Sequence, residues 1–514
     1  MRRERWGSRL GVIFAVAGSA IGLGNFLRFP VQAIKNGGGA FMIPYFISLF
    51  LLGIPLMWIE WTIGRFGGGF GHGTAPGIFH TLWRKNRFIK YFGVIGIFGP
   101  IVIFIYYVYI ESWLFAYIFF PFRSDYSLIT TKEEMIAFLQ GYQGIVKNQY
   151  FSSILPAYFF FFITFLINLI IIYLGIKKGI ETVCKIGMPT LFTLALILLI
   201  RVLTLKNLET PDWSPLNGLG FLWNPDFSSL KDAKVWLSAS GQIFFTLSVG
   251  IGVILTYASY LSKDDDVLLS GLTSASANEF AEVILGGSII IPASYVFFGP
   301  VGIKEIANQG AFDLGFITMP LILKSIPFSK IFEVLWFLLL FIAGLTSSIS
   351  LMQPAIAFLE DEFNLTRNKS ILIFGIISFL LSNLSVLFLS KGVVDELDFW
   401  GGTFSLVLFG TIETILFAWV FGMEKAWEEM HSGSDIILPR IYKFIIKYIT
   451  PLFLIAILTT WTIQYAIPIL LLKNVSKDNL PYILMTRIIL LLLFIGLCIL
   501  VKISWSKKGE KIET

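Results

Sequence analysis

Three glycines and an asparagine interrupt the first long apolar stretch of the chain. Gly18, Gly22 and Gly24 lie within seven residues, and Asn25 follows them. Each glycine costs a helix about 1 kcal/mol relative to alanine, so this stretch is a poor continuous membrane helix. A break exposes backbone N–H and C=O groups, which are tolerated in a bilayer only where they line a cavity or bind a ligand. These residues therefore predict a ligand site near the middle of a membrane.

A second interruption lies between Gln242 and Gly252, in a later apolar stretch. It contains Thr246, Ser248 and Gly250. Paired interruptions in two halves of a chain indicate a transporter built from inverted repeats, with its binding site between them. Glycine is also common in membrane helices, where small residues allow close packing. Close packing explains one interruption as well as a site does, but it explains the matched pair poorly.

The composition is that of a polytopic membrane protein with almost no aqueous domain. The chain has 514 residues, of which 56% are hydrophobic and only 14% are charged, whereas a soluble domain carries roughly 25% charged residues. About twelve apolar stretches are long enough to cross a bilayer core of about 30 Å. We predict helical spans at residues 10–34, 39–66, 88–121, 155–176, 179–203, 234–261, 268–300, 328–359, 369–390, 395–423, 440–468 and 479–503.

Basic residues near both ends predict the orientation. An even number of spans puts both termini on one side, and Lys and Arg favour the cytoplasmic side. The longer loops, at about 122–154, 204–233 and 301–327, then lie outside. The net charge of +6 comes from such segment ends and implies no nucleic-acid partner. The terminal basic residues are Arg2, Arg3, Arg5, Lys502, Lys507, Lys508 and Lys511.

Several motifs resemble those of the neurotransmitter:sodium symporters, above all the bacterial leucine transporters of that family. They are the runs 22–30 (GLGNFLRFP), 36–41 (NGGGAF), 55–61 (PLMWIEW), 106–113 (YYVYIESW), 343–348 (AGLTSS) and 395–400 (DELDFW). The resemblance covers nearly the whole chain and is weakest at residues 122–154. It implies one transmembrane domain, 1–514, with the LeuT fold: a repeat at about 10–203, an inverted repeat at about 234–423, and two further helices at about 440–503.

The resemblance also implies two sodium sites, which fit the chemistry of the interruptions. A desolvated sodium ion needs about five or six hard oxygen ligands, by analogy with other hard cations. The first implied site is Ala20, Asn25, Thr246 and Asn278, completed by the carboxylate of the substrate. The second is Gly18, Ile21, Ala343, Thr346 and Ser347. Without the resemblance, the hydroxyls of Thr346 and Ser347 are read as bonding back to the preceding helical turn.

The implied substrate is a neutral hydrophobic amino acid. Its carboxylate would meet the amides of Leu23 and Gly24 and the Tyr107 hydroxyl, because free N–H groups at a helix start favour an anion. Monoamine carriers of the family have Asp where this chain has Gly22, so Gly22 favours a substrate with its own carboxylate. The ammonium would meet carbonyls of Ala20, Phe245 and Thr246 and the Ser248 hydroxyl. The side chain would contact Ile103, Tyr107, Phe245, Ile251, Ser347 and Leu351, an uncharged set that offers no partner to a buried charge.

Other charged residues receive roles from the same resemblance. Glu282, with Tyr45 and Gln242 around it, would replace the chloride ion that some relatives require. Glu60 would accept hydrogen bonds from the broken backbones, while Glu111 and Glu413 are read as packing or helix–helix bonds. Arg28 with Asp398 would close the outer vestibule, and Arg3 with Asp361 the inner one, together with Trp6 and Tyr260. Without the resemblance, each charge of such pairs is a solvated interfacial group.

The sequence therefore predicts a chloride-independent sodium symporter in the cytoplasmic membrane of a prokaryote, with a possible homodimer. A carrier of another small zwitterion is the nearest alternative, and an amino-acid sensor or channel on the same fold is a more distant one. An enzyme is disfavoured because only His72, His80 and His431 are present and no paired histidine or nucleophile motif is visible.

Overall fold

The computed structural model describes residues 4–207, 209–225, 227–473 and 475–510. Over these residues the chain is helical and forms no strand beyond an isolated bridge between Gly38 and Pro225. Ten helical stretches of the described chain are long and apolar enough to cross a membrane. They are Gly39–Gly68, Ile89–Phe122, Leu155–Tyr173, Ile176–Leu203, Leu268–Gln309, Ser329–Phe363, Arg367–Leu387, Val393–His431, Arg440–Leu470 and Leu480–Lys507. Each lies on a predicted span, so the expected all-helical architecture is confirmed.

The two remaining predicted spans are the broken ones. The first consists of α1 (Arg9–Ala20) followed by η1 (Gly24–Arg28) and α2 (Phe29–Lys35), with a bend of 47° between the two parts. The sixth consists of α13 (Ala233–Thr246) and the short α14 (Val253–Ala258). Residues 247–252 separate these two helices without helical structure. Both interruptions predicted from the glycine pattern are therefore present.

Left-handed backbone conformations explain why the second break needs its glycines. Gly250 and Gly252 have φ angles of 74° and 88°, and Ser248 between the helices has a φ of 53°. Glycine adopts such angles without steric cost because it has no Cβ. The freed N–H of Gly250 is satisfied by the Glu60 carboxylate of α4 (Ile54–Gly68), as the intramembrane position of Glu60 predicted.

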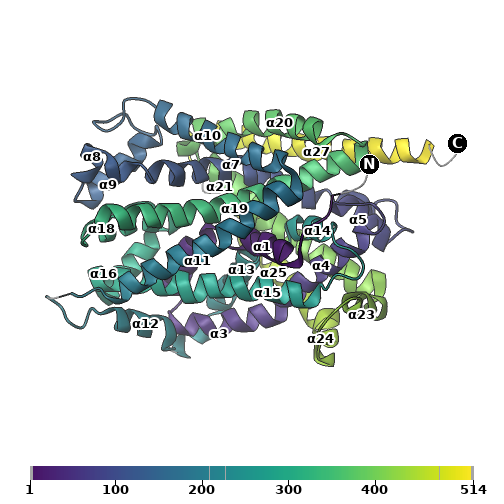
Figure 1. Ribbon diagram of the computed structural model, residues 1–514, viewed down its shortest axis with the longest axis horizontal. Coiled ribbons are helices and arrows are strands. Elements are labelled where there is room, and N and C mark those ends of the chain that lie inside the picture. The colour runs from purple at the N-terminus through teal and green to yellow at the C-terminus, as the bar shows by residue number, and fades with distance from the viewer. Residues whose placement is uncertain (1–3, 208, 226, 474, 511–514) are drawn as a thin grey trace.

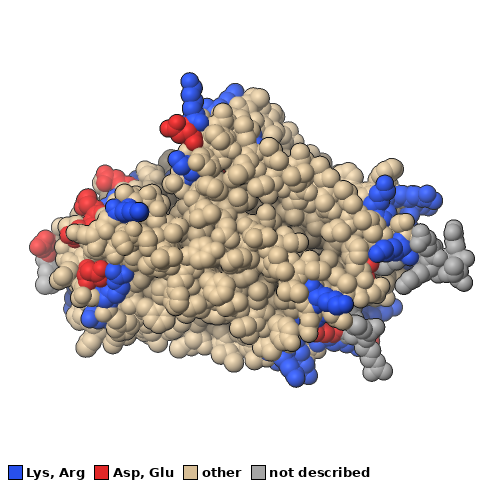
Figure 2. Space-filling model, turned by 90° about the horizontal axis from the view of Figure 1, so that it is seen from above, with Lys and Arg blue, Asp and Glu red and all other residues tan. Residues whose placement is uncertain are grey.

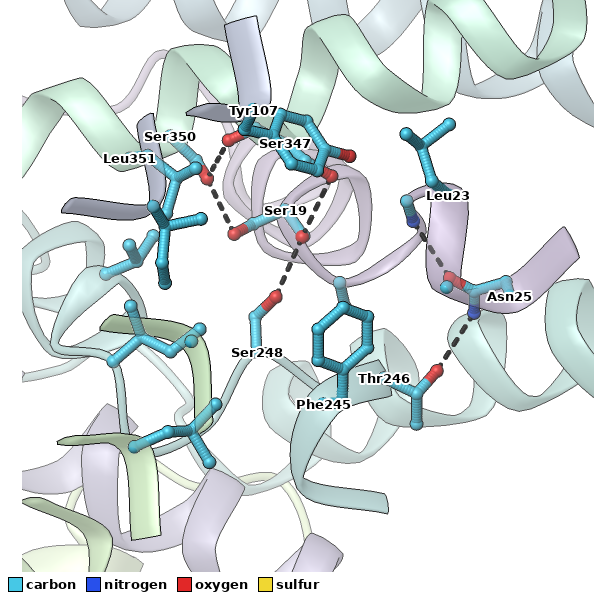
Figure 3. A pocket seen from close by; sticks show the side chains of 18 of the residues that line it. Ser19, Leu23, Asn25, Tyr107, Phe245, Thr246, Ser248, Ser347, Ser350 and Leu351 are labelled. Carbon is cyan, nitrogen blue, oxygen red and sulfur yellow. Dashed lines mark hydrogen bonds between the residues drawn. The ribbon is translucent and has the colours of Figure 1, made fainter. Parts of the chain in front are cut away.

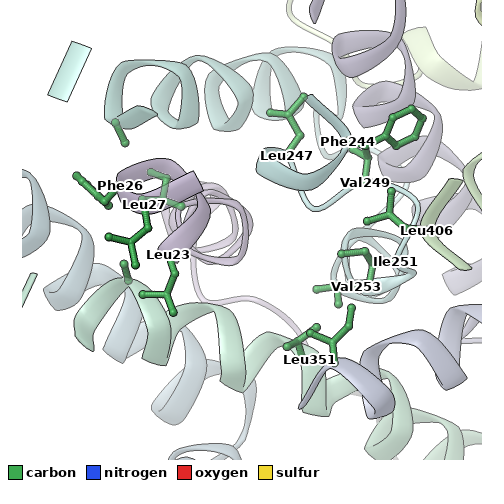
Figure 4. Close-up of a cluster of buried hydrophobic side chains, with 14 of the residues drawn as sticks. Leu23, Phe26, Leu27, Phe244, Leu247, Val249, Ile251, Val253, Leu351 and Leu406 are labelled. Atoms are coloured by element: carbon green, nitrogen blue, oxygen red, sulfur yellow. The ribbon is translucent and has the colours of Figure 1, made fainter. Parts of the chain in front are cut away.

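The helices run along the long axis of the molecule, with α1 near its centre (Figure 1). The long helix α19 (Ser329–Phe363) packs against α1, α7 (Ile95–Tyr117) and α11 (Thr182–Leu203). Leu23 and Ile251 from the two breaks are buried, together with Phe244 of α13 (Figure 4). The breaks thus lie in the interior and face no lipid.

The two ends of the chain lie at the same end of the molecule. In Figure 1, the N- and C-terminal labels are on the right, whereas α8 (Ser124–Ser127), α9 (Lys132–Tyr142) and α12 (Pro215–Trp223) are on the left. Figure 2 shows charged side chains mostly toward the ends of the long axis and a broad uncharged surface between them. An uncharged band between two charged ends is the surface that a bilayer requires.

The unwound loop predicts the effect of adding one methyl group. Gly250→Ala should lower the thermal unfolding temperature in detergent, because a left-handed residue with a Cβ costs about 1–2 kcal/mol and the new Cβ would meet the Leu406 carbonyl oxygen. Gly496→Ala is the matched control, since a Cβ there meets nothing within 4 Å. Equal unfolding temperatures for the two variants would contradict this account of the break.

Candidate functional site

A cavity of about 60 Å³ lies between the two breaks and is lined by α1, η1, α7, α13, α19 and the unwound loop before α14 (Figure 3). All twelve residues predicted to contact the substrate line it. They are Ala20, Gly22, Leu23, Gly24, Ile103, Tyr107, Phe245, Thr246, Ser248, Ile251, Ser347 and Leu351. None of the residues around the cavity is charged, so it offers uncharged surface and backbone groups only.

Several lining residues were not in the predicted set. They are Ser19, Tyr106, Val253, Ser350, Gly402 and Leu406. Gly402 and Leu406 come from η9 (Asp398–Phe404) and α22 (Ser405–Ile415). The sequence analysis predicted no broken helix there, so it gave no reason to place these two residues at the cavity. Ser350 lies three residues after Ser347 on α19, so one turn of helix geometry could have found it.

One end of the cavity presents backbone amides. The new helix starts with η1 at Gly24, directly after Leu23, so the first N–H groups there have no partner within the helix. The Gly22 N–H donates to Asn25 Oδ1 at 2.8 Å, which holds the turn. A Cβ placed on Gly22 would lie 3.2 Å from the Tyr107 hydroxyl and 2.9 Å from Ser347 Oγ. The space at Gly22 therefore lies beside the start of η1 and the Tyr107 hydroxyl, which are predicted to bind a carboxylate.

The predicted first sodium ligands come together beside this end. Asn25 Nδ2 lies 3.0 Å from Thr246 Oγ1 and 2.8 Å from Asn278 Oδ1, and Asn278 Nδ2 lies 3.0 Å from Thr246 Oγ1. All three side chains are buried, and Ala20 lines the same cavity. Hydroxyl and amide oxygens are hard donors of the type that alkali and alkaline-earth cations prefer. The arrangement can supply a cation site once the amide oxygens turn toward an ion.

The predicted second sodium ligands lie where α1 meets α19. Ser347 Oγ donates to the carbonyl oxygens of Gly18 at 3.3 Å and Ser19 at 3.2 Å, so it bridges the two helices. Thr346 Oγ1 lies 3.0 Å from Ile342 O and 3.2 Å from Ala343 O. Thr346 thus bonds back along its own helix, whereas Ser347 does not. Ile21 follows α1 directly and donates its N–H to Ala17 O.

Glu282 is fully buried in η6 (Phe280–Gly287), next to the first cluster. Its oxygens accept hydrogen bonds from Gln242 Nε2 at 2.5 Å, from Asn25 Nδ2 at 3.4 Å and from the Thr246 hydroxyl. Gln242 is therefore a neighbour that was predicted. The Tyr45 hydroxyl, the other predicted neighbour, interacts with Glu282 and also donates to Glu279 Oε2 at 2.7 Å. Glu279 is a second carboxylate beside the site that the sequence analysis did not single out.

Arg28 and Asp398, the predicted outer gate, contact aromatic residues and do not form an ion pair with each other. The Arg28 guanidinium lies over the Phe245 ring, 4.2 Å from the ring centre, and Asp398 Oδ1 accepts from the Tyr106 hydroxyl at 2.6 Å. Among the ion pairs of the described residues none joins Arg28 to Asp398 within 4.0 Å. The two charges are held by aromatic residues beside the cavity and do not contact each other directly.

The predicted inner gate is described in part, because Arg3 lies outside the described residues. Asp361 lies near the end of α19. Trp6 Nε1 donates to Tyr257 O at 2.9 Å, and the Tyr260 hydroxyl accepts from Gln353 Nε2 at 2.7 Å. Trp6 and Tyr260 therefore have separate partners.

The N-terminal segment is held by contacts that the sequence analysis did not predict. The Gly7 N–H donates to Glu181 Oε2 at 2.6 Å, and Ser8 Oγ donates to Glu181 Oε1 at 3.0 Å. Arg9 forms an ion pair with Asp266 at 2.9 Å. These acidic partners are far from the N-terminus in the chain, so only the fold brings them to it.

Comparison with known proteins places the chain in a family. The model of the sodium:neurotransmitter symporter family matches residues 3–137 and 152–507. The chain belongs to this family. An uncharacterised sodium-dependent transporter of Methanocaldococcus jannaschii is 31% identical over 89% of this chain and 90% of that protein. The sodium-dependent dopamine transporter of Caenorhabditis elegans is 25% identical over 90% of this chain and 81% of that protein.

A solved structure supports the same assignment. The structure of MhsT in complex with L-phenylalanine is similar with a TM-score of 0.76 and 30% identity, over 89% of this chain and 99% of that one. The all-helical LeuT-type membrane fold is thus confirmed. The chain is a sodium-dependent transporter of the membrane, and this family consists of secondary transporters, not enzymes.

Thr346 and Thr193 each donate a hydrogen bond back to their own helix, so a comparison of the two tests the predicted second sodium site. Thr346→Val should raise the sodium concentration for half-maximal uptake by about tenfold or more, which corresponds to about 1.4 kcal/mol, because it removes an oxygen beside α1. Thr193→Val removes a hydroxyl that likewise bonds back, to Pro189 O at 2.8 Å, but on an exposed side chain. An unchanged sodium dependence in Thr346→Val would contradict the assignment.

Proposed function

We propose that this transporter couples two sodium ions to the import of a neutral amino acid with an apolar side chain, without a requirement for chloride. The observation that carries the proposal is a buried cavity with no charged lining residue, placed between two broken helices. An amino acid brings its own carboxylate and ammonium, which broken backbones and cations can meet. A charged side chain would be buried without a partner, at a large cost.

The space at Gly22 supports a substrate with its own carboxylate. This space adjoins the Tyr107 hydroxyl, the start of η1 and the Asn25 cluster. A carboxylate here would contact both the amides and the first cation, so the ion and the substrate would stabilise each other. The cited relative structure contains an amino acid, L-phenylalanine, which agrees with this substrate class.

Glu282 supports independence from chloride. Its buried carboxylate accepts bonds from Gln242, Thr246 and Asn25, the groups beside the first cation cluster. A fixed negative charge at this place does the work of a bound anion, because it offsets the cation in a medium of low dielectric constant. The family resemblance assigns chloride-dependent relatives a serine at this position.

Alternating access would then come from one bundle rocking around a fixed site. Arg28 lies over Phe245 and Asp398 accepts from Tyr106, and both of these aromatic residues line the cavity. Trp6 lies before α1, in the N-terminal part of the chain. We propose that the end of the molecule that holds both chain termini faces the cytoplasm of a prokaryotic cell, since basic residues gather near both termini.

The direct test is uptake of radiolabelled leucine and alanine into proteoliposomes. An inward sodium gradient should drive accumulation above the equilibrium level, an equal potassium gradient should not, and replacing chloride by gluconate should leave the rate unchanged. Binding without accumulation would instead support a sensor. Uptake that ignores sodium, or that needs chloride, would contradict the corresponding part of the proposal.

A charge placed at Gly22 should reverse the substrate preference. In Gly22→Asp the new carboxylate would occupy the space beside Tyr107 and Ser347, so leucine uptake should fall at least 100-fold. Isoamylamine, which is leucine without its carboxylate, should gain sodium-dependent binding, measured as displacement of a labelled ligand or as a thermal shift. Gly22→Asn is the control of equal size, which should lose leucine without gaining the amine. Leucine uptake near the normal rate in Gly22→Asp would refute the pocket assignment.

A further inference from the structure

Two hydroxyl groups that lie side by side in the cavity lining, those of Ser19 on α1 and Ser350 on α19, have no role in the function proposed above. Their oxygens are 2.7 Å apart, both side chains are buried, and both line the cavity. We propose that this pair accepts a hydrogen bond from a hydroxyl on the substrate side chain, so that the site prefers small β-hydroxy amino acids such as threonine and serine. This inference rests on the proposed transport of a neutral amino acid, and it changes the expected side chain from a purely apolar one to a short one that carries a hydroxyl group.

The two hydroxyl protons of the pair are already used in hydrogen bonds, so the pair can only accept a further one. Ser350 Oγ lies 2.6 Å from Ser347 O, and a carbonyl oxygen can only accept, so the Ser350 proton is committed there. Ser19 must then donate its own proton to Ser350 Oγ. Lone pairs remain on Ser19 Oγ, with no hydroxyl proton left to donate from either residue.

Two neighbouring serine hydroxyls already donate to a carbonyl oxygen. Ser248 Oγ donates to Ser19 O at 2.9 Å, and Ser347 Oγ donates to Ser19 O at 3.2 Å. These four serine hydroxyls therefore offer acceptors and no donors. A buried acceptor gains from a ligand that carries a donor, and loses when an apolar group of the same shape takes its place.

The position of the Ser19–Ser350 pair places it near the substrate side chain. Figure 3 shows Ser350 and Leu351 on the opposite side of the cavity from Leu23 and Asn25, with Tyr107 between the two sides. The neighbouring lining groups Ile251 and Leu351 are apolar. Threonine matches this surface, because its β-carbon carries one hydroxyl and one methyl group.

The size of the cavity favours a short side chain. Its volume is about 60 Å³, whereas one water-sized probe needs roughly 10–15 Å³. The cavity thus holds only about four to six such probes, which favours a short side chain over a long one.

The test compares threonine with valine, which has the same shape but a methyl in place of the hydroxyl. Inhibition of sodium-dependent uptake of labelled alanine is measured for both amino acids in wild type, Ser19→Ala and Ser350→Ala. Wild type should prefer threonine by roughly 3- to 10-fold, the value of one neutral hydrogen bond. Each variant should bring this ratio close to one. Because the readout is a ratio, a general loss of activity does not affect it.

A second buried serine pair provides the matched control. Ser48 Oγ and Ser240 Oγ lie 2.9 Å apart, away from the cavity lining. Ser48→Ala should therefore keep the threonine preference.

Two results would overturn the inference. One is a wild-type ratio of one, and the other is an equal weakening of threonine and valine in Ser19→Ala, which would make the pair a structural link or an ammonium ligand. In both cases sodium-dependent alanine uptake would still support the proposed function. Loss of that uptake in wild type would overturn both proposals.

Discussion

The structure depends on satisfying backbone groups that two broken helices expose inside a membrane. Hydrocarbon offers no hydrogen bonds, so every freed N–H and C=O must find a protein partner, an ion or a ligand. The Glu60 carboxylate accepts the Gly250 N–H, and the Asn25 amide oxygen accepts the Gly22 N–H. Leu23 and Gly24, at the start of the second part of the first broken helix, line the cavity. The site thus lies where the two breaks meet.

Polar contacts across the site tie its broken helices to an unbroken helix. Ser347 and Ser350 of α19 reach the carbonyl oxygens and hydroxyl of the end of α1, and Ser248 of the unwound loop reaches the Ser19 carbonyl as well. On the far side of α19, Ser348 donates to Asn168, whose amide in turn donates to the buried Glu111. Glu111 therefore makes a helix–helix hydrogen bond, which is one of the two roles, packing or helix–helix bonding, expected from the sequence. One face of α19 meets the proposed ion and substrate site, and the other is fixed to α7 and α10 (Leu155–Tyr173).

Much of the fold could be predicted because the bilayer imposes strict rules on the sequence. Long apolar runs must be helices, so all twelve expected ranges hold helical elements, with boundaries that mostly shift by a few residues. The two breaks could be placed because glycines gather at both of them, and at the second Gly250 and Gly252 adopt left-handed backbone without steric cost. The predicted cavity residues could be named from motifs, since short stretches of the two broken helices supply most of them. Residues such as Leu406 and Gly402 could not be named, because nothing local distinguishes them from other packing residues.

By itself, the sequence determined the membrane class, the number and place of the helices, the two interruptions and the chemical types available to the site. Local backbone preference and hydropathy decide these properties, and both are written in neighbouring residues. Only the tertiary structure decided which polar side chains contact each other. It brought Glu279 to Tyr45, placed Arg28 over Phe245 and Asp398 beside Tyr106, and set Ser19 against Ser350. These pairings join residues far apart in the chain, and which of several nearby polar groups meet depends on the packing of whole helices.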